Sequence, residues 1–306
     1  MIVASGNNFH FLPYENGSLL QTLPAGIYQY KRATSQNPAY MEAFSPMRER
    51  PVQLDGEMFE AVREEVALFF TPAFRKSTEA AGQTHKMGIL LYGPPGTGKT
   101  HLVWALSDFM ISRNTAIIVN TEPHRDMDDA INLCRHNAPD RPIAMVWDEF
   151  EDQTDEYESF VLELLDGARS KSNVIAFAMT NFIDRIPERI YDRPSRFRLV
   201  QHISEPNESQ RRQFCKGMYP EITESDMDFL ITLTDGMSLD HLKQYAAMLL
   251  RENKSRRSVS SRVRGLIKTR IQAVQDQMDK PGMLERDLTQ LKGQMDRLEK
   301  EDTFMF

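Results

Sequence analysis

The chain has 306 residues, of which 41% are hydrophobic and 26% charged, and 44 acidic residues outnumber 37 basic ones to give a net charge of -7. This ordinary globular composition excludes collagen-like and largely disordered chains, and the acidic balance argues against a polycation that coats nucleic acid. Only two cysteines are present, too few for a disulfide framework, which points to a reducing compartment. No stretch reaches the roughly 18 apolar residues of a membrane helix. We therefore expect a soluble cytoplasmic protein without membrane insertion.

The first 50 residues form a region of their own. Short aromatic and β-branched runs at 9–12, 26–31 and 40–44 are broken by proline and Asn-Gly pairs. This pattern predicts a small β-rich N-terminal extension over 1–50. From 56 to 70, apolar residues recur at helical spacing, which predicts a helix that stops before Pro72.

Continuous apolar runs then alternate with amphipathic segments. We expect strands at 88–92, 116–120, 143–147, 174–180 and 198–203. Apolar strands separated by helices are typical of a mostly parallel sheet that is covered on both faces, so residues 51–205 are predicted to form an α/β domain.

The strand signal ends after this domain. Segments 208–218, 224–234 and 238–252 are predicted to be helical and to form a small all-helical domain over 206–255. Another predicted helix, 262–279, and the leucine-rich stretch beyond Pro281-Gly282 favour a C-terminal helical hairpin over 256–306.

A glycine-rich turn, GPPGTGKT, follows the strand predicted at 88–92 and opens a helix. Its glycines let backbone N–H groups converge on phosphate oxygens, its lysine adds a charge for the β- and γ-phosphates, and its threonine offers a hydroxyl to Mg²⁺. A chance glycine-proline turn is the alternative. The predicted ATP-binding residues are Gly93, Pro94, Pro95, Gly96, Thr97, Gly98, Lys99, Thr100 and His101.

Two acids end the strand predicted at 143–147. Asp148 suits the shell of Mg²⁺, and Glu149 suits the polarisation of an attacking water. Because the carboxyl ends of parallel strands meet at one edge, both acids should face the glycine-rich turn. The acids that follow, at 151–156, are better explained as a solvated loop. Asn181 ends the next strand, where it either holds the lytic water or serves only as a turn residue.

These motifs together resemble the AAA family of ATPases, in its core group of oligomeric protein-remodelling enzymes. GILLYGPPGTGKT resembles the family's Walker A, AMVWDE its Walker B, and VIAFAMTN its sensor-1 strand, over roughly 51–250 of the chain. The resemblance implies a P-loop NTPase core with a helical lid, bound ATP and Mg²⁺, and a homo-oligomeric ring, hexameric in this family. It also places Gly236, in TDGMSLDHLKQY, near the adenine or ribose.

IPERIYDRPSRF resembles the family's stretch with paired arginine fingers, which assigns Arg193 and Arg196 to the ATP of a neighbouring subunit. A guanidinium delivered to the γ-phosphate accelerates phosphoryl transfer by roughly 10³ to 10⁵. Ordinary surface or ion-pair arginines are the alternative.

The chain departs from the family after its second strand, where no aromatic pore-loop triplet is present. There His124 and Arg125 either face a pore or belong to a plain polar loop. The basic segment 251–270 either holds nucleic acid or an acidic partner or forms a solvated or inter-subunit helix face, and it has no aromatic residue for base stacking. The segment 301–306, EDTFMF, either docks on a partner or is a frayed or core-capping terminus.

The sequence therefore predicts a Mg²⁺-dependent ATP hydrolase that remodels an unidentified protein substrate or adaptor. A nucleic-acid motor or loader and a nucleotide-gated scaffold remain as alternatives.

Overall fold

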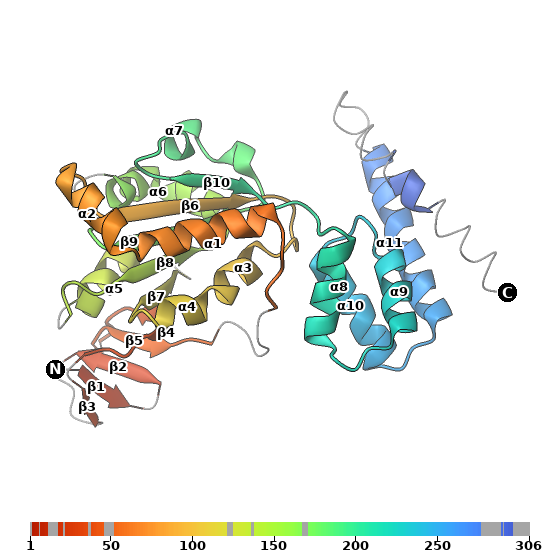
Figure 1. The fold of residues 1–306 in the computed structure, drawn as a ribbon, viewed down its shortest axis with the longest axis horizontal. Coiled ribbons are helices and arrows are strands. Elements are labelled where there is room, and N and C mark those ends of the chain that lie inside the picture. The colour runs from red at the N-terminus through yellow and green to blue at the C-terminus, as the bar shows by residue number, and fades with distance from the viewer. Residues whose placement is uncertain are drawn as a thin grey trace. The chain divides into compact units, whose positions relative to one another are not determined.

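The computed structural model describes residues 2–5, 7–11, 18–20, 22–35, 38–45, 52–120, 125–135, 138–166, 171–276, 289 and 291–295. The chain divides into two compact units, 1–204 and 205–306 (Figure 1). We call them the sheet unit and the helical unit.

One sheet organises the sheet unit. Its strands follow the spatial order β10-β6-β9-β8-β7-β4-β5-β2-β1-β3 within the described residues. Strands from β10 to β4 run parallel, and those from β4 to β3 pair antiparallel. The strands are β1 Ile2–Ser5, β2 Asn8–Phe11, β3 Ser18–Leu20, β4 Gly26–Lys31, β5 Tyr40–Ala43, β6 Lys86–Tyr92, β7 Ala116–Asn120, β8 Ile143–Trp147, β9 Val174–Thr180 and β10 Leu199–His202. The predicted mostly parallel α/β sheet is confirmed.

Helices cover both faces of the parallel strands. Leu90 of β6 packs in one core with residues of α5 and α6, whereas its neighbours Ile89 and Leu91 point to the opposite face because side chains alternate along a strand. On that opposite face lie α1, α3 and α4 (Figure 1). The helices of this unit are α1 Glu57–Phe69, α2 Pro72–Ala80, α3 Lys99–Ala105, α4 Ser107–Ile111, α5 Arg125–Arg135, α6 Phe150–Leu165 and α7 Glu188–Tyr191, with a 3-10 turn at Ile183–Arg185.

The N-terminal strands continue the same sheet. β4 pairs in parallel with β7, with Tyr28 opposite Ile118, and antiparallel with β5. Tyr28 and Met41 are buried, and both belong to the core that contains α5 and α6. The β-rich N-terminal segment is therefore joined to the main core by strand pairing and by side-chain packing.

Arg141 holds the chain segment before β4 in place. Its guanidinium donates to the carbonyl of Leu23, to the carbonyl of Asn114 at 3.0 Å and to the Asn114 side-chain oxygen at 2.9 Å. The residue is 4% exposed, and burial lowers the pKa of the guanidinium. Buried carbonyls need partners, so Arg141 ties the chain before β4 to the turn before β7.

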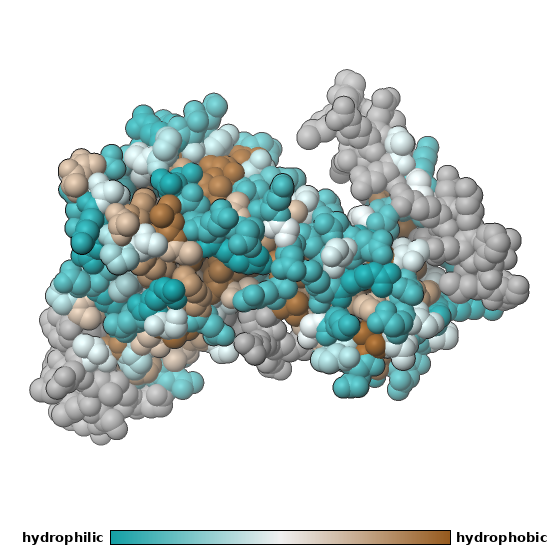
Figure 2. Space-filling view, in the orientation of Figure 1, coloured by the Kyte–Doolittle hydropathy of each residue, from teal (hydrophilic) through white to brown (hydrophobic). Residues whose placement is uncertain are grey.

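The helical unit contains α8 Glu208–Met218, α9 Glu224–Leu233, α10 Leu239–Leu250 and α11 Arg256–Asp276. Asn207 caps α8 in a reciprocal box with Gln210, and Thr223 caps α9. Buried apolar residues from all of these helices form the interior, while hydrophilic residues cover most of the face seen in Figure 2.

Two helices differ from the sequence-based expectation. The helix predicted at 56–70 is observed as α1 and stops before Pro72 as expected. The sequence analysis did not predict α2, which begins at Pro72 and is capped by Thr71, whose hydroxyl accepts a hydrogen bond from the Phe74 amide at 3.3 Å. α11 starts at Arg256 instead of 262, since the Ser255 hydroxyl accepts from the Ser258 amide at 3.3 Å. Most of the predicted hairpin beyond 276 lies outside the described residues, apart from helical residues at 289 and 291–295.

We predict that Arg141→Met lowers the free energy of unfolding of the sheet unit by about 2 kcal/mol, because the carbonyls of Leu23 and Asn114 lose their buried donor. Urea unfolding followed by tryptophan fluorescence measures this unit specifically, since the two tryptophans, Trp104 and Trp147, both lie in it. Arg75→Met, at a more exposed site, serves as the control. An unchanged urea midpoint for Arg141→Met would contradict the assigned role.

Candidate functional site

The glycine-rich turn adopts backbone conformations that favour glycine. Gly93, Gly96 and Gly98 have φ angles of 146°, 74° and 102°. A Cβ on Gly93 would lie 2.2 Å from the carbonyl oxygen of Ile203, so any side chain would push β10 away from β6. The turn therefore has the glycine-dependent backbone conformation that a phosphate loop requires.

Lys99 lies inside this turn and is 6% exposed. Its ammonium donates to the carbonyls of Gly93 at 2.8 Å and Pro94 at 2.9 Å, and to the side-chain oxygen of Asn181 at 2.7 Å. These three acceptors are uncharged, and the ammonium brings a positive charge into the turn. The loop can thus attract an anion such as a phosphate group.

Other residues of the turn support the loop. The Thr97 hydroxyl donates to the Pro94 carbonyl at 3.0 Å, and Thr97 is buried. The ring of His101 lies 2.7 Å from the Val52 carbonyl through Nε2. His101 thus ties the start of α3 to the segment before α1. Pro95 is exposed and Pro94 is half-buried.

Asp148 and Thr100 meet where β8 and the phosphate loop end. The Thr100 hydroxyl donates to Oδ2 of Asp148 at 3.1 Å, and Oδ1 of Asp148 accepts from the Glu149 amide at 3.2 Å. A hydroxyl and a carboxylate are the hard oxygen donors that Mg²⁺ prefers, and Mg²⁺ takes its remaining ligands from substrate phosphates and water. The pair therefore fits the predicted metal.

Glu149 is exposed and adopts a left-handed backbone conformation, with φ and ψ both 50°. This conformation costs a non-glycine residue energy and is often retained where it aims a side chain at a functional site. Glu149 directly precedes α6, so the helix fixes the direction in which its carboxylate leaves the sheet edge.

Strand order explains why these groups converge. β9 lies between β6 and β8, with Thr180 opposite Tyr92 and Ala178 opposite Trp147. Each functional residue follows the last residue of its strand, so the loop, Asn181 and Asp148 share one edge. The predicted nearness of these groups is observed.

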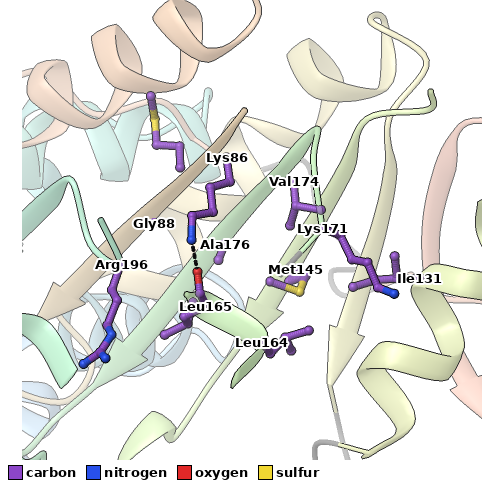
Figure 3. A pocket seen from close by; sticks show the side chains of 11 residues that line it. Lys86, Gly88, Ile131, Met145, Leu164, Leu165, Lys171, Val174, Ala176 and Arg196 are labelled. Atoms are coloured by element: carbon purple, nitrogen blue, oxygen red, sulfur yellow. Dashed lines mark hydrogen bonds between the residues drawn. The ribbon is translucent and has the colours of Figure 1, made fainter. Parts of the chain in front are cut away.

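The two predicted finger arginines have different surroundings. Arg193 is exposed in the turn that precedes β10. The Arg196 side chain, which also borders the small cavity shown in Figure 3, is 10% exposed. It donates to the Arg189 carbonyl and lies 3.9 Å from Oδ2 of Asp166. In this conformation Arg196 is held by its own chain.

Asp166 organises the turn that carries these arginines. It accepts from the Ser195 hydroxyl at 3.0 Å and from the Lys86 ammonium at 3.0 Å. Burial raises the pKa of this carboxyl, but the hydrogen bonds from Lys86 and Ser195 and the charges of Lys86 and Arg196 together bring it below its usual value. Asp166 was not identified from the sequence, where only its position after a predicted helix was visible.

Gly88 is a second residue that sequence reasoning missed. A Cβ at this position would lie 1.9 Å from the Arg196 carbonyl oxygen. The turn that carries Arg193 and Arg196, which we call the arginine turn, can pass over β6 only because Gly88 has no side chain. A glycine inside a strand was the available signal, since such glycines mark close backbone approaches.

A small cavity of the sheet unit is a separate feature. It holds about 20 Å³ between the first residues of β6 and β9 and the end of α6, and its lining includes Met145, Leu164 and Val174 (Figure 3). That is room for about one water, at the end of β6 that is remote from the phosphate loop. It is too small for a nucleotide.

The remaining predicted residues are placed as follows. Gly236 lies in the helical unit, in the turn between α9 and α10, with a φ of 67°. His124 falls outside the described residues, and for Arg125 only the helical backbone is described.

The described part of the chain lacks both a metal-binding cluster and a membrane-spanning helix. No group of three or more His, Cys, Asp or Glu side chains there is placed to hold a metal ion. None of its helices is both long and apolar enough to cross a membrane.

Comparison with known proteins identifies the family. Residues 89–205 match the model of the ATPase family associated with various cellular activities (AAA). The mitochondrial chaperone BCS1 of Danio rerio is 27% identical over 60% of this chain and 47% of its own length. The 26S proteasome regulatory subunit 6B homolog of Saccharomyces cerevisiae is 31% identical over 52% of this chain and 42% of its own length.

The Cell division cycle protein 48 homolog of Archaeoglobus fulgidus is 30% identical over 53% of this chain. The chain spans less than half the length of each of these three relatives. The matched region contains the phosphate loop, Asp148, Glu149 and Asn181, which meet at one edge of the sheet. We conclude that residues 89–205 form an AAA-family ATPase domain.

Proposed function

We propose that this protein hydrolyses ATP with Mg²⁺ as an oligomeric ring, hexameric as in the family it resembles, and uses the reaction to remodel a protein partner. The observation that carries the proposal is the Lys99 ammonium, which contacts both the phosphate loop and Asn181 within 3 Å. The same sheet edge carries Thr100, Asp148 and Glu149.

Binding is proposed to begin at Lys99. Phosphate oxygens are charged acceptors and replace the weaker carbonyl and amide acceptors that the ammonium contacts now. The exchange releases the side chain of Asn181, which then contacts the γ-phosphate or the lytic water. Thr100 and Asp148 would hold Mg²⁺, which would supply positive charge to stabilise the phosphates.

Hydrolysis then needs a base and a water molecule. Glu149 accepts a proton from the water while the water oxygen bonds to the γ-phosphorus, and the bond from that phosphorus to the β–γ bridging oxygen breaks. The products are ADP and inorganic phosphate. The exposed position of Glu149 at the sheet edge supports this role.

In the proposed oligomer, a neighbouring copy of the chain supplies an arginine to the ATP. Arg193 is exposed and lies in the turn before β10, so its guanidinium is available to another copy of the chain. Arg196 is held by the Arg189 carbonyl and Asp166, and we propose that it first positions this turn. The ring number and the lid role of the helical unit, with Gly236 near the nucleotide, remain part of the proposal.

The relatives support a protein partner. They include a mitochondrial chaperone and a proteasome regulatory subunit, names that indicate work on proteins. Some cations of the basic segment are engaged within the helical unit. Arg256 binds Asp226 at 2.7 Å, and Arg270 lies 3.2 Å from His241.

A nucleic-acid motor is the second candidate, because Arg262 and Lys268 of α11 are exposed. ATPase activity that rises on addition of DNA and falls steeply with salt would favour it over protein remodelling. If the protein acts as a nucleotide-gated scaffold, a partner would bind without being unfolded.

We predict that Lys99→Ala weakens ATP binding by at least about tenfold, because a charge-assisted hydrogen bond of about 1.5–3 kcal/mol is lost. Titration calorimetry with a non-hydrolysable ATP analogue measures the affinity. Lys76→Ala, at an exposed lysine of α2, is the matched control and should bind normally. Wild-type affinity in Lys99→Ala would remove the residue from the phosphate site.

Glu149→Gln should keep ATP affinity and reduce kcat by about 10² to 10⁴, the usual contribution of a general base. Steady-state phosphate release and analogue binding separate the two effects. Glu151→Gln is unsuitable as a control because Glu151 is buried, whereas exposed Asp152→Asn tests a neighbouring acid. Rapid turnover by Glu149→Gln would exclude the assigned role.

Arg193→Ala should lower kcat by about 10³ or more if the arginine serves a neighbour. Mixing it with Glu149→Gln should restore part of the activity, because some interfaces then pair an intact Glu149 with an intact Arg193. Arg185→Ala, at another exposed arginine, should stay close to the wild-type rate. Identical rates in mixed and separate samples would show that Arg193 does not act between subunits.

A further inference from the structure

The helical unit contains a long groove between α10 and α11, which lie side by side in Figure 1. The groove measures about 1250 Å³ and runs from His241 to the region around Ser255. It belongs to the helical unit alone and includes none of the predicted ATP-binding residues.

The groove is lined by both polar and apolar residues, and we call its apolar residues the floor and its arginines the basic rim. Met248 of α10 and Leu266 of α11 are half-buried and supply apolar surface, and the exposed Arg262 also lines the groove. Arg257 adds a second positive charge, and Glu252 is the one acid among the lining residues. A peptide that joins acidic residues to large apolar ones would complement this surface.

Gly265 opens the floor. It lies in the interior of α11, where glycine lowers helix stability relative to alanine, yet a Cβ at this position would meet nothing within 4 Å. No close packing inside the described chain explains the glycine. Gly265 is exposed in the groove, so the open space beside it leaves room for an inserted side chain.

The chain itself contains a segment of the required chemistry. Residues 301–306 read EDTFMF, with Glu301 and Asp302 followed by Phe304, Met305 and Phe306. The acids match the basic rim, and the apolar residues match the floor. The structural description ends at 295, before this segment.

The segment is tethered near the groove. Gln294 is buried and donates to the carbonyls of Asp235 at 3.0 Å and Gly236 at 3.3 Å. The chain from Gly236 to His241, a groove residue, is at most ~18 Å long, so the groove begins within that distance of Gly236. The chain from 295 to 301 can span up to ~22 Å, which is more than this distance. The same chain can therefore deliver 301–306 to its own groove.

We propose that the groove between α10 and α11 is the docking surface for residues 301–306 of the same chain. Glu301 and Asp302 pair with the basic rim, chiefly Arg262, and the phenylalanine rings lie on the floor above Gly265. Because this contact lies outside the predicted nucleotide site, the proposal does not depend on ATP hydrolysis.

Cysteine crosslinking in the full-length protein tests the contact. Ser261→Cys in the groove is combined with Met305→Cys, and a short bismaleimide joins the two thiols. The native cysteines are buried, which raises the pKa of Cys134 to about 12 and of Cys215 to about 11, so neither competes near neutral pH.

We expect a link within one chain that forms about tenfold or more faster than in Ser209→Cys with Met305→Cys, because docking raises the local concentration only at the groove. Ser209 is an exposed serine of α8 and is the matched control. Equal rates at the two sites would overturn the proposal. A link formed mainly between two chains would also overturn it, because the occupant would then be a second copy.

Two further variants test the chemistry of the contact. Gly265→Leu should slow crosslinking severalfold by filling the floor, while circular dichroism shows that the helix is retained. Arg262→Glu should also slow it, and adding Asp302→Arg to Arg262→Glu should restore the rate. Unchanged rates in Gly265→Leu and Arg262→Glu, or no recovery in the charge-swapped protein, would contradict the proposed docking.

Discussion

The buried charge of Lys99 connects the parts of the nucleotide site. An ammonium removed from water needs acceptors close by, and here the ends of β6 and β9 provide them through Gly93, Pro94 and Asn181. The phosphate loop and Asn181 are therefore joined through the Lys99 ammonium. In the proposed mechanism, a phosphate takes over this role, and the release of Asn181 reports that it has arrived.

Two glycines, Gly88 of β6 and Gly93 directly after it, allow the rest of the site to approach. Gly93 permits the Ile203 carbonyl, and Gly88 permits the Arg196 carbonyl, to lie where a side chain would otherwise be. The phosphate loop and the arginine turn are thus attached to one strand. Asp166 adds a third link, because it binds both Lys86 of β6 and Ser195 of the turn. A displacement of the arginine turn would consequently also displace β6, the strand that carries the phosphate loop.

The chain adds two features to this core. Strand β4 pairs with β7, and Arg141 secures the chain before it through carbonyls on both sides. In the helical unit, α10 and α11 leave a basic, partly apolar groove that is independent of the phosphate loop. We place the inferred intrachain contact in this groove, and partner recognition there or on the N-terminal strands would leave the nucleotide site free to work.

The amino-acid sequence by itself determined the strands β7, β8 and β9, the phosphate loop and the acids of the site, because each is encoded by neighbouring residues. Glycine spacing, apolar runs and the residue at a strand end are local signals. The roles of Asp166, Gly88 and Arg141 were decided only by tertiary structure. Each depends on a partner far along the chain, such as Leu23 for Arg141, and no local pattern specifies which distant carbonyl or guanidinium a side chain will meet.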